Sequence, residues 1–571
     1  MRRLALLIGL LVSSTVQAGA LMERLQAVIE RQAMPEAATG RYPLSTAEGR
    51  RQMVVTAHPL ATEAALQVLR DGGSAVDAAI TAQAVLGLVE PQSSGFGGGA
   101  FIVHARQGEV MAVDGRETAP AAASPDRFTR LGLPMLFDQA LGEGRAIGVP
   151  GVVAALDEAH RRWGKLPWSR LLAPAIQLAD NGFPVSDRLS RLSGGDRLIP
   201  DHPALRQYLL DADGKAWPPG TRLRNPAYAR LLRTLAGQGP AAFYRGPLAA
   251  KLVAGARAAG SDLTLADWSG YRARVSPALC APVKKVRVCS APPPAGGLSV
   301  IEGLSLWSRA PAALPFDHAL LEAERLAFAD RQRYSADPAF VPVPVAGLLA
   351  NDYLDARALR IGEQASKGVT AGVPTGASLA LATDRQLREQ GTTHLAVVDR
   401  QGHWLAMTSS IEDAFGSRLL VEGLLLNNQL TDFSFVPEQD GRAVANRVQP
   451  GKRPRSAMSP TVALDGQGHP VFSVGSPGGG RIIGFVTGVL ARWLAGEQDP
   501  GRLVSAPIVL ARQELTEVEL GYPAARLAAL KAREHDVMER EMASGLAVIT
   551  REGDRLLGAA DPRREGRAAG D

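Results

Sequence analysis

The local pattern that decides the fold lies at residues 392–410, which read Thr392-Thr393-His394-Leu395-Ala396-Val397-Val398-Asp399-Arg400-Gln401-Gly402-His403-Trp404-Leu405-Ala406-Met407-Thr408-Ser409-Ser410. Two runs rich in apolar and β-branched residues flank a polar turn that contains glycine, a pattern typical of a β-hairpin. The preceding residues, 366–391, are rich in Ser, Gly, Thr, Gln and Arg, so we expect them to run over the surface. The sequence therefore predicts a buried strand that begins abruptly after an exposed connection.

Other segments predict strands and helices that alternate along the chain. We expect strands at 53–57, 101–104, 110–114 and 471–474, helices at 60–71, 75–89 and 481–494, and a mostly helical region at 148–335. Ser74 and Asp77 have the spacing of a helix capping box. Strand pairs with helices on both sides favour a layered α+β architecture.

A run of glycines at 95–99 precedes one of these strands. Glycine runs also occur in dinucleotide-binding loops, but those lead from a strand into a helix, whereas this run leads into a hairpin. We therefore interpret the run as a place where backbones pack closely.

The composition is that of an ordinary globular protein of 571 residues, 46% hydrophobic and 21% charged. Lys and Arg number 63 against 57 Asp and Glu, and no basic run exceeds three residues. A nucleic-acid site needs a concentrated basic surface, often with aromatic side chains for stacking. We therefore expect no nucleic-acid partner.

The first 20 residues have the features of a secretory signal: Met1-Arg2-Arg3, an apolar run at 4–12, and small residues up to Ala18 and Ala20. We expect cleavage after Ala18 or Ala20, and a periplasmic or secreted protein. The apolar run is shorter than the roughly 20 residues that span a bilayer, so we expect no membrane anchor. A short buried N-terminal helix is the alternative.

The two cysteines, Cys280 and Cys289, flank a segment that can fold back as a short hairpin. In an exported protein such a pair can form a disulfide. Two buried free thiols fit the same spacing, because sequence gives no Cα distances. Both alternatives stay open here.

Common catalytic and metal-binding motifs are missing from the sequence. The nine histidines include no His-x-x-x-His pair, and there is no phosphate-binding loop, Gly-x-Ser-x-Gly elbow or acidic calcium loop. A Ser-His-Asp triad assembled from distant positions has no local support. We expect neither a metal nor an organic cofactor.

From Thr392 outward, the sequence closely resembles the γ-glutamyltransferase family of N-terminal-nucleophile hydrolases. The matching motifs follow in order along most of the chain, at residues 53–57, 72–79, 116–120, 392–394, 427–433, 450–454, 475–479 and 561–563. An ordered set of this kind is far more specific than any one motif.

The resemblance implies a four-layer αββα sandwich of the N-terminal-nucleophile hydrolase type, with an additional helical region in the large subunit. It also implies a zymogen that cleaves itself between Gly391 and Thr392. The products would be a large subunit of residues 21–391 and a small subunit of residues 392–571. Since neither contains all of the motifs, both should stay together as a heterodimer.

The chemistry of Thr392 fits this implication. A cut before Thr392 gives it a free α-amino group with an ordinary pKa of about 7.7 to 8, which can act as the base for its own hydroxyl. The same hydroxyl could first attack the carbonyl of Gly391, which lacks Cβ and tolerates a strained backbone. Without the resemblance, Thr392 would be interpreted as an ordinary strand residue.

By resemblance, the other site residues divide between catalysis and substrate binding. Those near the nucleophile are the oxyanion-hole pair Gly478 and Gly479, at a strand-to-helix turn, and the neighbours Ser410 and Thr393. Those that hold a γ-glutamyl group are Arg116 and Ser456 at its α-carboxylate, and Asp432, Gln429 and Glu412 at its α-ammonium. Taken alone, Arg116 would be assigned to a surface ion pair.

Three departures from the family pattern bear on specificity. Ala457 follows Ser456 where a second serine is common, and Glu412 stands where many bacterial members have Asn. Losing one hydroxyl to the carboxylate costs on the order of 1 kcal/mol. Residues 433–450 are short and lack a Tyr-bearing lid, which predicts an open cleft.

We therefore expect an enzyme that transfers or hydrolyses γ-glutamyl groups of glutathione and similar compounds through a Thr392 ester, with amines, amino acids or water as acceptors. The alternative is a glutaryl-amide acylase of the cephalosporin type on the same scaffold. Its substrates lack the amino group, so Asp432 favours the first function. A non-catalytic exported binding protein is the third possibility.

Overall fold

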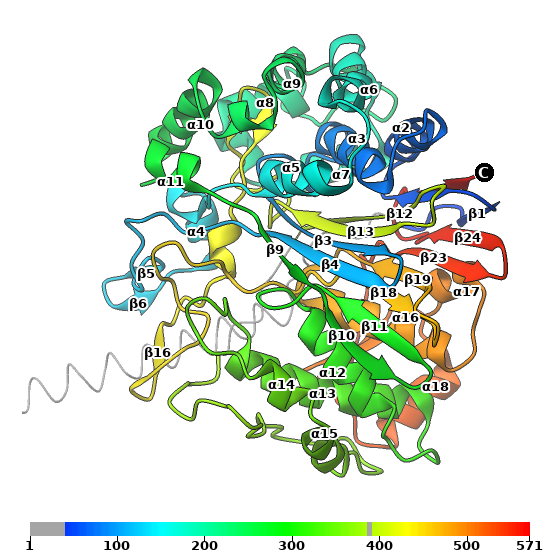
Figure 1. The fold of residues 1–571 in the computed structure, drawn as a ribbon. Coiled ribbons are helices and arrows are strands. Elements are labelled where there is room, and N and C mark those ends of the chain that lie inside the picture. Colours follow the sequence, from blue (N-terminus) through cyan, green and yellow to red (C-terminus); the bar gives the residue numbers. More distant parts are fainter. Residues whose placement is uncertain (1–39, 385–390) are drawn as a thin grey trace, which may run out of the picture.

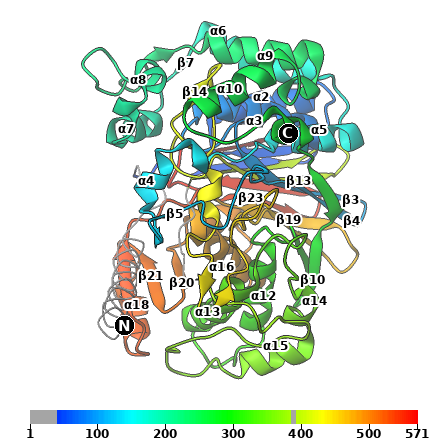
Figure 2. The same cartoon turned by 90° about the vertical axis from the view of Figure 1, so that its left-hand side faces the viewer.

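The computed structural model describes residues 40–384 and 391–571 (Figure 1). At its centre two seven-stranded sheets are stacked, and helices cover the outer face of each (Figure 2). Neighbouring strands in both sheets are antiparallel. The predicted four-layer αββα sandwich is confirmed, while the predicted signal at residues 1–20 lies outside the described residues.

The first sheet carries the 392–410 hairpin at its centre. Its strands follow in the order β25 (Arg567–Gly570), β2 (Met53–Thr56), β12 (Thr393–Val398), β13 (Trp404–Ser410), β3 (Gly99–Arg106), β4 (Glu109–Gly115) and β9 (Arg274–Pro277). The second sheet has the order β1 (Ser45–Gly49), β24 (Arg555–Ala560), β23 (Ala547–Glu552), β19 (Pro470–Gly475), β18 (Thr461–Leu464), β11 (Val286–Ser290) and β10 (Leu279–Val283).

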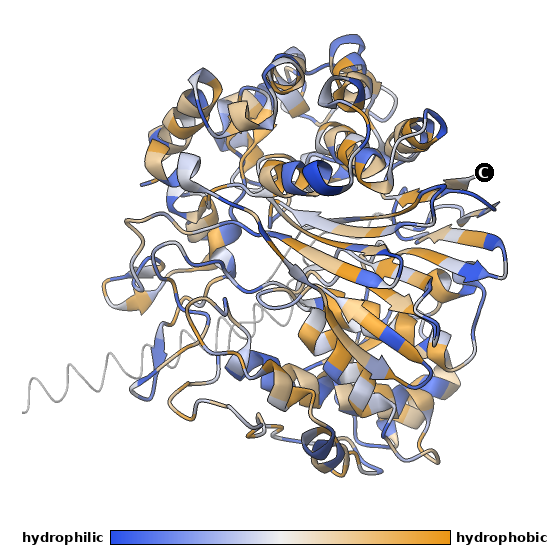
Figure 3. Ribbon diagram, in the orientation of Figure 1, coloured by the Kyte–Doolittle hydropathy of each residue, from blue (hydrophilic) through white to orange (hydrophobic). Residues whose placement is uncertain are grey.

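Two groups of helices form the outer layers. On the first sheet lie α2 (Pro59–Arg70), α3 (Ala75–Val89) and α5 (Val152–Trp163), with α6 (Trp168–Asn181) packed on α3 and α9 (Pro226–Gln238) packed on α6. On the second lie α12 (Gly297–Trp307) and α16 (Ile482–Leu494), with α13 (Phe316–Tyr334) packed on α12. Figure 3 shows that hydrophobic residues concentrate in the sheets between these layers.

The remaining elements surround this sandwich. The helices are α4 (Phe137–Leu141), α7 (Asp187–Gly195), α8 (Pro203–Leu209), α10 (Pro247–Ala258), α11 (Leu265–Gly270), α14 (Val345–Leu348), α15 (Asn351–Ala358), α17 (Pro500–Ser505) and α18 (Ala524–Lys531). Short strand pairs are β5 (Thr129–Arg130) with β6 (Leu133–Pro134), β7 (Phe183–Pro184) with β8 (Arg222–Leu223), β14 (Leu420–Val421) with β15 (Leu424–Leu425), and β16 (Glu438–Gln439) with β17 (Arg442–Ala443). A three-stranded sheet contains β20 (Val509–Arg512), β21 (Leu515–Glu519) and β22 (Val537–Arg540).

Strand β12 explains why the hairpin occupies the centre of the molecule. Leu395 and Val397 belong to the apolar cluster beneath the first helical layer, whereas Ala396 and Val398 belong to the cluster between the sheets. Side chains alternate between the faces of a strand, so a strand that is apolar on both faces must be covered on both.

Helix α3 packs directly against this strand and is almost wholly buried. The predicted capping box is present: the Ser74 side chain accepts from the Asp77 amide, and the Asp77 side chain accepts from the Ser74 amide. A cap of this type stabilises a helix by about 1 kcal/mol. Small residues on every side let the helix lie close to both the sheet and α2.

The glycine run confirms the prediction of close packing. A Cβ atom at Gly97 would overlap the carbonyl oxygen of Leu425, and one at Gly98 would overlap that of Ser410. At Gly99 it would overlap the carboxyl group of Glu117. The run therefore packs closely against three segments, which carry Leu425, Ser410 and Glu117.

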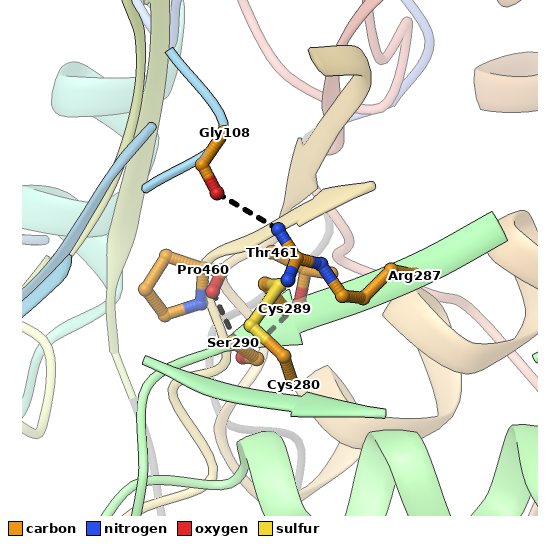
Figure 4. The surroundings of a disulfide bond; sticks show 7 residues. All are labelled: Gly108, Cys280, Arg287, Cys289, Ser290, Pro460 and Thr461. Atoms are coloured by element: carbon orange, nitrogen blue, oxygen red, sulfur yellow. Dashed lines mark hydrogen bonds between the residues drawn. A yellow bond between two sulfur atoms is a disulfide. The ribbon is translucent and has the colours of Figure 1, made fainter. Parts of the chain in front are cut away.

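The two cysteines form a disulfide across the β10–β11 hairpin, which selects one of the two alternatives left open by the sequence (Figure 4). Cys280 and Cys289 are directly opposite each other in the strand register. The region 148–335 is mostly helical, as predicted, but it also contributes β9 to the first sheet.

Both sheets combine strands from before and after Gly391. In the first sheet, β2 pairs with β12 and β3 pairs with β13. In the second, β1 pairs with β24 and β11 pairs with β18. A break after Gly391 would therefore leave each piece hydrogen-bonded to the other along several strands.

Within the described residues, no helix combines the length and the apolar character needed to cross a membrane.

Candidate active site

Gly391 and Thr392 lie directly before β12, and Thr392 is buried. The backbone of Gly391 has φ +42°, in the left-handed region that favours glycine. A Cβ atom there would also overlap the carbonyl oxygen of Glu412. Both conformation and space therefore require glycine before Thr392.

Two hydroxyl groups converge on the carbonyl oxygen of Gly391. Ser410 Oγ donates to it at 2.6 Å, and the hydroxyl of Thr392 is bonded to the same oxygen. The amide of Glu412 donates to Ser410 Oγ at 2.9 Å, which orients that hydroxyl. Negative charge on this oxygen would thus meet a donor that is already in place.

The Thr392 carbonyl oxygen has a partner that sequence reasoning missed. Arg564 Nη1 donates to it at 3.3 Å, and the same guanidinium donates to the Ala543 carbonyl. Arg564 follows the 561–563 motif directly, and that position beside the motif was the available signal.

The side chain of Thr393 reaches the C-terminal end of α3. Its hydroxyl donates to Glu90 Oε2 at 3.3 Å, and Glu90 Oε1 lies 3.9 Å from Arg188 Nε. Thr393 therefore follows Thr392 in the chain, but its hydroxyl binds the buried Glu90 carboxylate.

His394 ties the hairpin to the second sheet. Its ring fills the space beside Gly475, where a Cβ atom would overlap it, and Nδ1 lies 2.8 Å from Thr408 Oγ1. Burial lowers the pKa of His394 to about 3, so the ring is neutral near pH 7.

The oxyanion-hole candidates follow β19 a few residues after Gly475. Gly478 and Gly479 have φ +129° and +58°, and a 3₁₀ turn at Gly479–Arg481 leads into α16. A Cβ atom at Gly478 would overlap the ring of Phe485. The first N–H groups of a helix have no intrahelical acceptor and lie at its positive end, so this turn suits a developing oxyanion.

Arg116 and Asp432 form a buried ion pair, although they are far apart in sequence. Arg116 Nε donates to the Pro454 carbonyl at 3.1 Å, and Nη2 donates to the Arg455 carbonyl at 2.8 Å. Asp432 Oδ2 also accepts from Gln429 Nε2 at 2.7 Å. The structure thus brings together three predicted substrate-binding residues, two of them on the 3₁₀ turn Gln429–Asp432.

The other two predicted binding residues flank this pair. Glu412 has φ +82° and accepts from Asn428, the residue that precedes the 3₁₀ turn. Ser456 follows Arg455 directly, and its hydroxyl accepts from the Met458 amide at 3.1 Å. Glu412 therefore links the turn that carries Asp432 to Ser410.

Glu117 is a buried carboxyl group that sequence reasoning assigned no role. Its Oε2 lies 3.7 Å from Arg116 Nη1. Burial raises the pKa of Glu117 to about 8, with the Arg116 charge opposing this and Asp432 adding to it. The carboxyl group is therefore mostly protonated at pH 7.

One group of metal-ligand types lies close together among the described residues: His318, Glu322 and His535. His318 Nδ1 faces His535 Nε2 at 2.8 Å, and His318 Nε2 lies 2.8 Å from the Gly362 carbonyl oxygen. Thr516 Oγ1 lies 3.0 Å from His535 Nδ1. The four ring nitrogens are thus occupied by a chain of hydrogen bonds.

The fold and the site together define a class. A four-layer sandwich that presents a buried threonine at the start of a central strand, with its hydroxyl on the preceding carbonyl, has the fold of an N-terminal-nucleophile hydrolase.

Comparison with known proteins gives the family. The model of the gamma-glutamyltranspeptidase family matches residues 61–571. The glutathione hydrolase proenzyme of Bacillus subtilis (strain 168) is 34% identical over 468 residues, 77% of each chain, and that of Escherichia coli (strain K12) is 31% identical over 550 residues, 91% of each chain. The acylase ACY 1 proenzyme of Pseudomonas sp. (strain SE83) is 33% identical over 541 residues, 91% of this chain and 93% of that one.

Solved structures agree with this assignment. The cephalosporin acylase from Bacillus halodurans superposes with a TM-score of 0.82 at 26% identity, covering 95% of this chain and 98% of that one. The γ-glutamyltranspeptidase of Helicobacter pylori gives a TM-score of 0.51 at 28% identity over 53% of this chain and 90% of that one. The chain belongs to the γ-glutamyltranspeptidase family, and it is an enzyme.

Proposed function

We propose that this protein cleaves itself before Thr392 and then transfers or hydrolyses γ-glutamyl groups from glutathione and related donors. The observation that carries the substrate assignment is the buried Arg116–Asp432 pair. The observation that supports the self-cleavage is the pair of hydroxyls on the Gly391 carbonyl oxygen.

Self-cleavage would begin when Thr392 Oγ1 attacks the carbonyl carbon of Gly391. The C–N bond to Thr392 breaks, its nitrogen takes up the hydroxyl proton, and an ester joins Gly391 to Thr392 Oγ1. Ser410 Oγ would stabilise the charge on the carbonyl oxygen during the attack. Water then opens the ester, leaving a large subunit ending at Gly391 and a small subunit beginning at Thr392.

Turnover would use the amine that cleavage releases. The α-amino group of Thr392 takes the proton of Oγ1, which attacks the γ-carbonyl carbon of the donor. The amides of Gly478 and Gly479 would hold the oxyanion, and the leaving amine takes the proton from the ammonium. An amine, an amino acid or water then attacks the γ-glutamyl ester and regenerates Thr392.

The Arg116–Asp432 pair is complementary to the α-carboxylate and α-ammonium of a γ-glutamyl group. In the substrate-free site these two side chains neutralise each other. A zwitterionic donor can replace both halves of the pair, so that neither buried charge is left alone. A glutaryl donor would satisfy Arg116 but leave the Asp432 carboxylate without its cation, at a cost of several kcal/mol.

An acylase acting on glutaryl amides is the second candidate, favoured by the similarity to the Pseudomonas acylase proenzyme and the Bacillus halodurans structure. Steady-state kinetics with γ-glutamyl-p-nitroanilide and glutaryl-p-nitroanilide separate the two. We expect kcat/KM for the γ-glutamyl compound to be at least tenfold higher, the effect of about 1.4 kcal/mol of discrimination. A preference for the glutaryl compound would overturn the primary proposal.

The location and assembly belong to the same proposal. We infer export to the periplasm or outside the cell from the signal features of residues 1–20. The partners would be the two subunits of one precursor, a γ-glutamyl donor and its acceptor.

A further inference from the structure

Lys452 has a fully buried side chain and lies two residues before Pro454, whose carbonyl accepts from Arg116. Its ammonium donates to the carbonyl oxygens of Ala445 at 2.6 Å and Arg447 at 3.0 Å, and to Gln449 Oε1 at 2.9 Å. An ammonium has three N–H donors, so these three neutral acceptors use all of them. The Lys452 side chain therefore fixes the shape of the 445–449 segment.

Asn446, inside that segment, bridges the two sides of the recognition site. Its Nδ2 donates to the backbone carbonyl of Asp432 at 2.7 Å, and its Oδ1 accepts from the Arg455 amide at 2.9 Å. The Asn446 carbonyl accepts from the Ser434 amide at 3.0 Å. The Asn446 side chain thus joins Asp432 to Arg455, whose carbonyl accepts from Arg116.

Arg116 has an anchor that does not depend on this bridge. The Pro454 and Arg455 carbonyls accept from its guanidinium. Farther along, the Ala119 amide donates to the Lys452 carbonyl at 2.9 Å, and the Gly451 amide donates to the Ala119 carbonyl at 3.1 Å. Loss of the Asn446 bridge should therefore displace Asp432 more than Arg116.

We propose that Asn446 and Lys452 are positioning residues that set the distance between the Arg116 and Asp432 charges and thereby select donors with an α-ammonium over donors without one. This inference rests on the proposed function. Neither side chain needs to touch the donor: Asn446 acts on Asp432 and Arg455, and Lys452 acts on the segment that carries Asn446.

The test compares γ-glutamyl-p-nitroanilide with glutaryl-p-nitroanilide in purified, self-cleaved enzyme. For Asn446→Ala and Lys452→Met we expect the ratio of the two kcat/KM values to fall at least tenfold. The fall should come from a higher KM for the γ-glutamyl compound, because the reacting groups at Thr392 are unchanged. Lys452→Gln keeps two N–H donors and should retain more of the ratio than Lys452→Met.

The exposed Lys285 supplies the matched control, since it lies in the turn between β10 and β11, and Lys285→Met should leave the ratio unchanged. Folding is monitored by self-cleavage, which depends on Ser410 and Gly391. Should Asn446→Ala fail to cleave, Lys452→Met carries the test. A ratio within twofold of the unmodified enzyme in cleaved Asn446→Ala or Lys452→Met would overturn the inference, whereas an unmodified enzyme that prefers the glutaryl compound would overturn the proposed function.

Discussion

At the residue scale, Ser410 Oγ donates to the Gly391 carbonyl oxygen. Ser410 is not itself part of the Gly391–Thr392 bond. We expect Ser410→Ala to slow self-cleavage by about 10² or more, the usual effect of removing one oxyanion donor. Ser409→Ala is the matched control, because Ser409 Oγ donates instead to Gln83 Oε1 at 2.7 Å. Cleavage is followed by denaturing gel after expression, and equal rates in the two variants would contradict the assigned role.

Glu117 makes a pH-dependent contribution to stability. Its pKa is raised from an ordinary 4.5 to about 8 by burial, so the folded protein retains a proton that the unfolded chain has already lost. The free energy of unfolding should therefore fall as pH rises from about 4.5 to 8. Glu117→Gln does not titrate, so its Tm relative to the unmodified protein should increase steadily between pH 5 and pH 8. Parallel Tm curves would show that Glu117 is ionised in the folded protein.

At the element scale, the glycine run before β3 offers a sharp comparison within one segment. Gly98→Ala would place a methyl group on the Ser410 carbonyl oxygen, whereas a Cβ atom at Gly95 would have the Gly87 Cα as its nearest neighbour, at 3.7 Å. Overpacking typically costs about 1 to 3 kcal/mol. We expect Gly98→Ala to lower Tm clearly and to impair self-cleavage, while Gly95→Ala changes both little. Equal Tm values would mean that the β3 contacts are looser than described.

The elements most readily predicted from sequence were those with strong local patterns. The alternation in β12, the capping box at Ser74 and the hairpin between the cysteines are encoded within a few residues each. Strand β9 was missed because its residues lie within the region predicted to be mostly helical and become a strand only by pairing with β4. The cysteine pairing needed the strand register, which spacing alone does not give.

The sequence predicted some residues of the candidate site and missed others, because it shows local patterns but not contacts between distant segments. Residues within recognisable motifs, such as Arg116 and Asp432, were identified, and the structure brings them together. Lys452 lies within a recognised motif and Arg564 and Asn446 do not, but none of the three was given a role. Their contacts are with backbone carbonyl groups, which every residue type supplies, so the sequence does not show them. The separate direction of the Thr393 hydroxyl likewise depends on α3.

At the scale of the whole molecule, both sheets are built from segments on either side of Gly391. The C-terminal residue adds to this, because Arg70 Nε donates to Asp571 Oδ2 at 2.9 Å and Gln52 Nε2 donates to the same oxygen at 2.8 Å. We expect the cleaved protein to elute as one species in gel filtration and to separate only in denaturant. The disulfide joins Cys280 and Cys289 within the large piece, so a reducing agent should not release the small one. Separation without denaturant would contradict the interleaved sheets.

In the proposed mechanism, Thr392 supplies both the attacking hydroxyl and the base once the chain breaks before it. N-terminal sequencing of the small fragment of active enzyme, run beside a Thr392→Ala preparation, tests this most directly. We expect a fragment that begins Thr392-Thr393-His394 in the active enzyme, and an intact, inactive chain in the variant. An active enzyme without that fragment, or a variant that still cleaves at the same bond, would contradict it.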